Sequence, residues 1–495
     1  MTPPLRFGIF PDPCESESEA LLSITAAIQI STGTTTTDTA IQTLANQGEG
    51  GEMTDYLFFG AAVSKIDDDF QDYLQRAHTE SHHPLCLCKS PPVPMYVSRV
   101  NNSYILKRMP NKGSEHHPDC DSYEIPVGLS GRGLVQNRAI VEDHDSGLTS
   151  LKLAFPLSKL ASSRDPVTAS AGEKKTVHAD PAKLSMRAYF EYLYEEAGLT
   201  RWSPKMKGKR NWHIVRHHLL QASQNKHSRR SPLAECTWVP EVFSVDKKDE
   251  IAGRRRRFLS GLKAEKGKTP FALMIGEIKA IETSRFGGKL IIKHMPDAPI
   301  YMAEDVFRRV NKAFAAEIAL FEEDESIHLL AMMTFYLSAS GNPQVETITF
   351  ITVDQYWLPF ESVDERELLE RLVSDRRYFI KSMRYNLSST DVVAAAIITD
   401  TKPDPTAFYI VPMGATESFY DEMDELCKST GIPSSIWDAN EEAAMSLPPA
   451  GRSTLTRESS DGGPDSEESL PGQHYDDYPE PDGERFDMYA DEDRG

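Results

Sequence analysis

Two short cysteine-containing segments carry the residue types best suited to binding a metal ion. Cys86 and Cys88 form a Cys-x-Cys pair, and Cys120 ends the later sequence HHPDC. A structural zinc site needs four soft or borderline ligands in a tetrahedron, and thiolate sulfur and imidazole nitrogen commonly supply them. We therefore predict a zinc site formed by Cys86, Cys88, His117 and Cys120, with His116 as the alternative to His117.

We expect the metal at this site to be structural. Four protein ligands leave no coordination position open for a substrate. Zinc binding contributes on the order of 10 kcal/mol to folding, which a small β module with a marginal core needs. The alternative is that the thiols are ordinary small buried side chains and that the histidines lie in a polar loop.

A strongly basic segment follows these motifs. Residues 183–268 contain 20 basic and 9 acidic residues, whereas residues 441–495 contain 16 acidic and 4 basic residues. Because basic side chains neutralise phosphates and aromatic rings stack on exposed bases, we predict that the basic segment binds nucleic acid, with DNA as the expected partner. A helix-turn-helix or winged-helix arrangement would insert the helix expected at 212–222. The predicted contact residues are Lys205, Lys207, Lys209, Arg210, Trp212, Arg216, Arg229 and Arg230.

The alternative for this basic segment is a solvated face that docks on the protein's own acidic C-terminal segment. A second basic block, Arg254–Arg257, precedes Phe258 and Leu259. Both blocks lie in a chain whose formal net charge is -21. The charge is therefore segregated along the chain, and its sum alone does not exclude a polyanionic partner.

Acidic residues farther along the chain resemble part of a nuclease site. The sequence PFESVDERELLERL looks like the opening of a restriction-endonuclease-type fold, in which a helix glutamate, a strand aspartate and a Glu-x-Lys strand hold a divalent metal. Glu361 or Glu365 and Asp400 match the first two parts. The strand expected at Ala407–Pro412 has neither carboxylate nor lysine, so the resemblance implies a degenerate cleft. The favoured interpretation is an amphipathic helix with solvated acids.

Apolar periodicity predicts the elements that must position these residues. Alternation predicts a strand at Tyr56–Ala61 and a hairpin that pairs Met95–Val100 with Tyr104–Met109. Helical spacing begins at Leu184, and one long helix is expected at Ala303–Phe321. Strands and helices then mix up to about residue 412, so the expected fold class is α+β.

At 495 residues the chain is too long for one core, and we expect several domains. The expected order is 1–53 disordered, 54–160 a zinc-binding β-rich module, 161–182 a linker, 183–268 a basic helical module, 269–439 a mixed α/β domain that the nuclease resemblance makes restriction-endonuclease-like, and 440–495 a disordered acidic tail.

We expect a cytoplasmic protein with no membrane contact. No stretch approaches roughly 18 consecutive apolar residues, and the N-terminus lacks the pattern of a secretory signal. Six unevenly spaced cysteines do not form a disulfide scaffold, which fits a reducing compartment.

Several longer motifs resemble one bacterial family, the domain of unknown function 1173. They are PLCLCKS (84–90), YILKRMP (104–110), HHPDCDSYE (116–124), GEIKAIETSRFGGKLIIKHMPD (276–297) and WLPFESVDERELLERL (357–372). The resemblance covers roughly residues 54–438. It implies carriage on proteobacterial plasmids and integrative elements, which favours a role in DNA maintenance or transfer, and it assigns no activity and no ligand residues.

Taken together, these patterns predict a non-enzymatic, zinc-binding, nucleic-acid-associated accessory protein of a mobile genetic element. One alternative is a metal-dependent nuclease that acts through Glu361, Glu365 and Asp400. The other is a protein-interaction adaptor whose basic and acidic parts contact partner proteins or each other.

Overall fold

The computed structural model describes residues 55–100, 103–143, 146–160, 180–229, 231–263 and 267–451. The disorder expected at 1–53, most of the linker expected at 161–182, the acidic tail beyond residue 451 and Arg230 lie outside the described residues. Within them the chain mixes helices with several sheets, so the α+β class is confirmed.

The N-terminal part is a five-stranded sheet in the order β2-β1-β3-β4-β5, with helix α3 packed on β4 and β5. The predicted hairpin is confirmed, because β4 pairs antiparallel with β5. The single strand expected at Tyr56–Ala61 is wrong: Phe59 and Gly60 both have positive φ, and this tight turn splits it into β1 and β2. The elements are β1 Tyr56–Phe58, β2 Ala61–Val63, α3 Phe70–Thr79, β3 Leu85–Cys86, β4 Val93–Val100 and β5 Ser103–Arg108.

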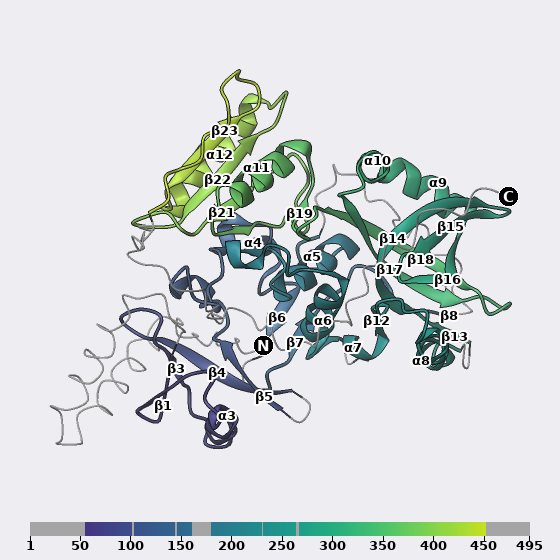
Figure 1. Cartoon of the computed structure of the whole chain (residues 1–495), viewed down its shortest axis with the longest axis horizontal. Helices are drawn as coiled ribbons and strands as arrows, with labels where there is room; N and C mark the ends of the chain where they lie inside the picture. Colours follow the sequence, from purple (N-terminus) through teal and green to yellow (C-terminus); the bar gives the residue numbers. More distant parts are fainter. Residues whose placement is uncertain are drawn as a thin grey trace, which may run out of the picture.

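The middle of the molecule is built on two packed helices, α5 and α6, beside a four-stranded sheet in the order β11-β10-β7-β6 (Figure 1). Both helices begin at a capping side chain: Ser185 accepts from the backbone N–H of Ala188, and Asn211 accepts from that of Ile214. The elements here are η1 Gly113–Glu115, η2 Val127–Leu129, α4 Arg132–Val135, β6 Ile140–Glu142, β7 Thr149–Leu151, β8 Ser158–Leu160, α5 Met186–Glu196, η3 Pro204–Met206, α6 Trp212–Ser223, β10 Lys226–Ser228, β11 Ser231–Pro232 and α7 Leu233–Cys236.

A seven-stranded sheet forms the next part, in the order β12-β14-β15-β16-β18-β17, with β19 on β18 and a further pairing of β14 with β17. The single helix expected at Ala303–Phe321 is wrong, because it divides at Phe314 into α9 and α10. The elements are β12 Thr237–Trp238, α8 Lys248–Ser260, β13 Lys268–Pro270, β14 Ala272–Ser284, β15 Gly287–Ile292, β16 Met295–Ala303, α9 Glu304–Ala313, α10 Ala315–Glu323, β17 His328–Leu337, β18 Pro343–Val353 and β19 Pro359–Phe360.

The C-terminal part is a five-stranded sheet in the order β23-β22-β21-β20-β9. Strand β9 comes from the segment just before α6, so this sheet is completed by residues from the middle of the chain. The elements are β9 Arg201–Trp202, α11 Val363–Ser374, β20 Phe379–Lys381, β21 Ala396–Ile398, β22 Thr406–Val411, α12 Glu417–Thr430 and β23 Ser434–Asp438.

One hydrophobic core joins several of these parts. It takes side chains from residues 135–155, from α5 and α6, and from strands β14, β17 and β18. Met383 and Tyr385, near the C-terminal sheet, complete it. The segments expected as separate modules at 54–160, 183–268 and 269–439 therefore share buried apolar surface, which is the main stabilising term in folding. Among the described residues, no helix has the length and apolar composition needed to cross a bilayer.

Candidate metal centre

Strand pairing and one short turn bring the cysteine motifs together. Cys86 ends β3 and is held in register by pairing with Tyr56 on β1 and Val93 on β4. Cys88 follows in the turn before β4. Cys120 lies beyond the hairpin, after the short helix η1. The hairpin therefore spans the sequence gap between the two cysteine motifs and returns the second motif to the first.

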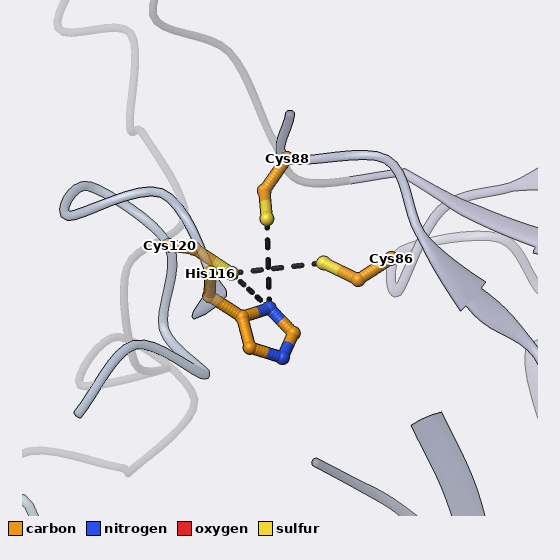
Figure 2. Close-up of side chains that lie close together, drawn as sticks. All are labelled: Cys86, Cys88, His116 and Cys120. Atoms are coloured by element: carbon orange, nitrogen blue, oxygen red, sulfur yellow. Dashed lines mark hydrogen bonds between the residues drawn. The ribbon is translucent and has the colours of Figure 1, made fainter. Parts of the chain in front are cut away.

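The four candidate ligand atoms have the spacing of a tetrahedral zinc site (Figure 2). The Sγ atoms of Cys86 and Cys120 are 3.7 Å apart. Nδ1 of His116 lies 3.5 Å from Sγ of Cys88 and 3.7 Å from Sγ of Cys120. Zinc–sulfur bonds of about 2.3 Å and a zinc–nitrogen bond of about 2.0 Å imply separations of about 3.8 Å between sulfurs and about 3.5 Å between sulfur and nitrogen. All four atoms lie within 4.8 Å of one another.

His116, and not the favoured His117, is the histidine in this cluster. His116 is 2% exposed. The side chain of His117 is 52% exposed, and its Nδ1 accepts from the backbone N–H of Asp119. The HxxC spacing favoured His117, but helix η1 ends at Glu115 and the chain then becomes extended, so that consecutive side chains point in opposite directions. The side chain that points toward the cysteines is therefore that of His116.

Two backbone N–H groups point at sulfur atoms of the cluster. The N–H of His117 lies 3.4 Å from Sγ of Cys88, and the N–H of Ser122 lies 3.4 Å from Sγ of Cys120. Such hydrogen bonds favour the thiolate form, which is the form that binds metal. The local backbone is thus arranged to stabilise negative charge on two of the three sulfurs.

The sulfurs also perturb one another's pKa. Hydrogen bonds from Cys86 and Cys88, in that order of size, lower the pKa of Cys120, and His116 adds to this effect. Hydrogen bonding to Cys120 raises the pKa of Cys86, and it raises the pKa of Cys88 to about 11. Because the three thiols lie close together, ionisation of one makes ionisation of the others less favourable. A bound divalent cation would stabilise all three thiolates.

A buried ionic network connects the loop that carries the second cysteine motif to the rest of the molecule. We call this loop, residues 116–126, the metal loop. Glu124, in the same loop as Cys120, pairs with Arg108 and lies 2.9 Å from Arg132. Arg132, whose side chain is 5% exposed, also pairs with Glu195 and Glu196 at the end of α5. Burial would raise the pKa of Glu124, but Arg108 and Arg132 outweigh that effect and hold this pKa below its ordinary value. The position of the metal loop is therefore coupled electrostatically to α5.

The predicted nucleic-acid contacts divide into exposed and internal side chains. Arg210 is buried, and its guanidinium donates to the backbone carbonyls of Leu199 and Arg201. Trp212 is buried, and its indole N–H donates to a backbone carbonyl 2.8 Å away. Arg210 and Trp212 therefore belong to the core, contrary to their predicted place on a binding surface.

The remaining predicted contacts lie at or near the surface. Arg216 is half-buried, and its Nε donates to the backbone carbonyl of Val239, 3.0 Å away. The exposed members of the predicted set are Lys205, Lys207, Lys209 and Arg229.

Each carboxylate of the nuclease hypothesis has a cationic partner. Glu361 pairs with Arg187 and Arg384. Oε1 of Glu365 is 3.2 Å from Nζ of Lys381, and Glu365 is itself buried. The three carboxylates do not gather: among the described residues, only the cysteine and histidine cluster brings three or more potential metal ligands together.

The third carboxylate of that hypothesis is paired as well. Asp400 accepts two hydrogen bonds from Nε of Arg377 and one from its Nη2, and a further one from the backbone N–H of Tyr378. A side chain bound in this way is already neutralised, so binding Mg²⁺ there would require breaking a buried ion pair.

A buried polar cluster that the sequence did not predict surrounds Glu277 on β14. Oε1 of Glu277 lies 2.8 Å from Nδ1 of His328 and 2.7 Å from Nζ of Lys293, and Nε2 of His294 lies 3.3 Å from Oε2. Burial would raise the pKa of Glu277, but the two histidines and Lys293 hold it well below its ordinary value. Each imidazole also stacks on an indole ring. The only sequence signal was that Glu277, Lys293 and His294 fall within one distinctive motif.

The fold and the site define an α+β protein that carries a candidate Cys₃His metal centre. The chain belongs to the family described as "Protein of unknown function (DUF1173)", whose model matches residues 58–440, so the predicted resemblance is confirmed. No curated protein and no solved structure matches the chain.

Proposed function

We propose that this protein is a zinc-binding, nucleic-acid-associated accessory protein of a mobile genetic element, and that it acts without catalysing a reaction. The observation that carries the metal part is the convergence of Cys86, Cys88, His116 and Cys120, whose ligand atoms lie within 4.8 Å of one another. Nucleic-acid association rests on the segregation of charge along the chain and on the exposed basic side chains. The mobile-element role rests on what the family resemblance implies.

The donor set favours zinc over magnesium, calcium and manganese. Three thiolates and one imidazole are soft and borderline ligands, whereas magnesium, calcium and manganese prefer carboxylate and carbonyl oxygens. With four protein ligands the coordination shell is closed, so the proposed role of zinc is to hold the loop of Cys120 against the N-terminal sheet. That loop carries Glu124, through which zinc would also support the ionic network around Arg132.

Adjacent histidines provide a matched test of the ligand assignment. We expect His116→Ala to lower the zinc content of the purified protein well below one ion per chain, because it removes a ligand. His117→Ala removes the same group from an exposed position and should leave zinc at one per chain. Inductively coupled plasma mass spectrometry measures both. Equal zinc content in the two variants would contradict the assignment of His116.

Nucleic-acid association is supported by lysines on one short segment. Lys205, Lys207 and Lys209 are exposed and lie within five residues of one another. A protein that uses them on phosphates releases counterions, so its affinity falls steeply as salt rises. We expect wild-type protein to bind a mixed-sequence DNA duplex with such a salt slope in fluorescence anisotropy. Absence of binding at low ionic strength would favour the adaptor alternative.

The nuclease alternative receives less support. Glu365 lies on helix α11, as the restriction-endonuclease-type template requires of its glutamate, but Asp400 lies just after strand β21 and not on it. Their pairing with Lys381 and Arg377, however, leaves neither carboxylate ready for a metal ion. Incubation of the protein with plasmid DNA and Mg²⁺ tests this alternative. Cleavage that Asp400→Ala abolishes would support the nuclease and overturn the non-catalytic part of the proposal.

A further inference from the structure

The outer face of helix α8 carries a shallow groove, and none of its residues was among the predicted nucleic-acid contacts. The groove has a volume of about 590 Å³ and is lined entirely by one helix. Figure 1 shows α8 at the periphery of the molecule, in the region of β13. We call it the α8 groove, and its lining residues are Glu250, Gly253, Arg254, Arg256, Arg257 and Ser260.

The inner face of α8 anchors the helix. Ile251 is buried, and Phe258 and Leu259 pack against the core of the seven-stranded sheet. The ring of Phe258 lies 5.0 Å from that of Trp238. Because these apolar residues recur at helical spacing, they fix which side chains of α8 face outward.

Two of the four consecutive arginines are neutralised by fixed carboxylates. Arg254 donates to both carboxylate oxygens of Glu241, with its Nε 2.8 Å from Oε1. Arg255 donates to both oxygens of Asp297, with its Nη1 3.0 Å from Oδ1. These bidentate pairs hold the helix to its neighbours and remove two charges from the surface.

The other two arginines of the run, Arg256 and Arg257, present their positive charge to solvent. Arg256 and Arg257 are both exposed, and neither forms an ion pair with another described residue. The one carboxylate in the groove, that of Glu250, lies 3.7 Å from Nη1 of Arg254. The net charge offered to a ligand in the α8 groove is therefore positive.

Gly253 lines the groove and leaves open space beside the helix backbone. A glycine in the interior of a helix costs about 1 kcal/mol relative to alanine. Neither packing nor backbone conformation requires it here, because a Cβ at this position would meet no atom within 4 Å. The missing side chain leaves a notch between arginines, and such a notch lets the backbone of a ligand approach the helix closely.

We propose that the α8 groove binds the phosphate backbone of a nucleic-acid duplex, a proposal that rests on the nucleic-acid association inferred above. Charge complementarity carries it: guanidinium groups match phosphate oxygens in geometry as well as in charge, and Gly253 gives a phosphate room beside the helix. Contacts to phosphate oxygens carry no base-sequence information, so the contact proposed for α8 is independent of base sequence. It makes α8 a second basic surface in addition to Lys205–Lys209.

The test is a salt titration of the full-length protein with a fluorescein-labelled mixed-sequence DNA duplex. Arg256→Ala/Arg257→Ala removes the two available charges, and Gly253→Leu fills the notch without lowering helix propensity. The matched control is Arg308→Ala/Lys312→Ala, which removes two exposed charges from α9, the next helix along the chain, which lies apart from α8 (Figure 1). Circular dichroism melts establish that all the variants are folded.

We expect the double arginine variant to lower the salt slope by about 1.8 and the affinity at 0.1 M salt by about 60-fold, as the loss of two phosphate contacts implies. Gly253→Leu should weaken binding while raising or preserving thermal stability, and the α9 control should bind within twofold of wild type. Arginine variants that bind like wild type would overturn the α8 proposal alone. Wild type that fails to bind at any salt would overturn the proposed function too.

A third outcome concerns the chain's own acidic segment. Suppose that a labelled peptide of residues 452–495 binds wild type but not the double arginine variant, and that neither protein binds DNA. The groove would then receive that segment, and the nucleic-acid proposal would be overturned in favour of an intramolecular contact.

Discussion

Replacement of Arg132 tests the connection between the metal loop and the rest of the molecule. Its buried guanidinium contacts carboxylates from three separate parts of the chain: Glu124 in the metal loop, Glu142 on β6, and Glu195 and Glu196 on α5. Arg132→Met keeps an apolar stem of similar length and leaves these acids without their shared cation. We therefore expect a large loss of stability.

The magnitude follows from the burial of the partners. Removing one member of a buried ion pair costs about 3–5 kcal/mol, because an uncompensated charge stays behind. For a cooperative unit of roughly 400 residues, this cost lowers the midpoint of thermal unfolding by about 4–6 °C. The matched control is Arg76→Met on α3, which breaks an exposed pair with Glu80 just after that helix and should shift the midpoint by less than about 1 °C.

Differential scanning calorimetry at pH 7.5 measures both variants. If Arg132→Met unfolds within 1 °C of wild type, or shifts no more than Arg76→Met, the network does not couple the metal loop to α5. A shift near the expected size that is accompanied by loss of zinc would extend the coupling to the metal itself.

Three further predictions concern other parts of the structure. Burial raises the pKa of Asp354 to about 6, so the ionised carboxylate lowers the free energy of unfolding as pH rises from about 4 to 6, and the loss is constant above that range. Asp354→Asn should therefore raise the unfolding midpoint by roughly 3 °C at pH 7.5 and leave it unchanged near pH 4. Equal shifts at both pH values would refute this. Gly131→Ala places a methyl group against the backbone carbonyl of Arg384 and should lower the unfolding midpoint by roughly 1–4 °C in the same calorimetry experiment. An unchanged midpoint would show that the backbone around Gly131 and Arg384 moves apart without a loss of stability. Chelation of bound zinc should add three fast-reacting thiols in an assay with dithionitrobenzoate, and an unchanged number would contradict metal protection of the cysteines.

The sequence predicted the convergence of the three cysteines more accurately than the bounds of the elements around them. Cys86, Cys88 and Cys120 meet as expected, because a hairpin that alternates apolar and polar residues has only one register that buries its apolar face. The choice between His116 and His117 depended on where η1 ends, and a one-residue difference in a turn has no periodic signal.

The basic segment shows where charge patterns fail as predictors. Arg210 and Trp212 were predicted to be surface residues because they lie among lysines in the sequence. In the structure both are buried and donate hydrogen bonds to backbone carbonyls in the core. Sequence proximity to charged residues carries no information on burial, which is decided by tertiary contacts from distant strands. Arg256 and Arg257 gained importance for the same reason: only the structure shows that their neighbours Arg254 and Arg255 are already paired.

The shared core was also beyond prediction. Residues 135–155, α5, α6 and the strands of the seven-stranded sheet contribute to one apolar cluster although they are far apart in the chain. Composition changes at 161–182 and near 268 suggested boundaries, but composition does not tell whether the flanking segments pack together.

X-ray absorption at the zinc K-edge, on protein purified without added metal, tests the central claim most directly. The proposed function predicts about one zinc per chain with three sulfur atoms at about 2.3 Å and one nitrogen atom at about 2.0 Å. A spectrum dominated by oxygen ligands, or no zinc in correctly folded protein, would contradict a metal held by Cys86, Cys88, His116 and Cys120.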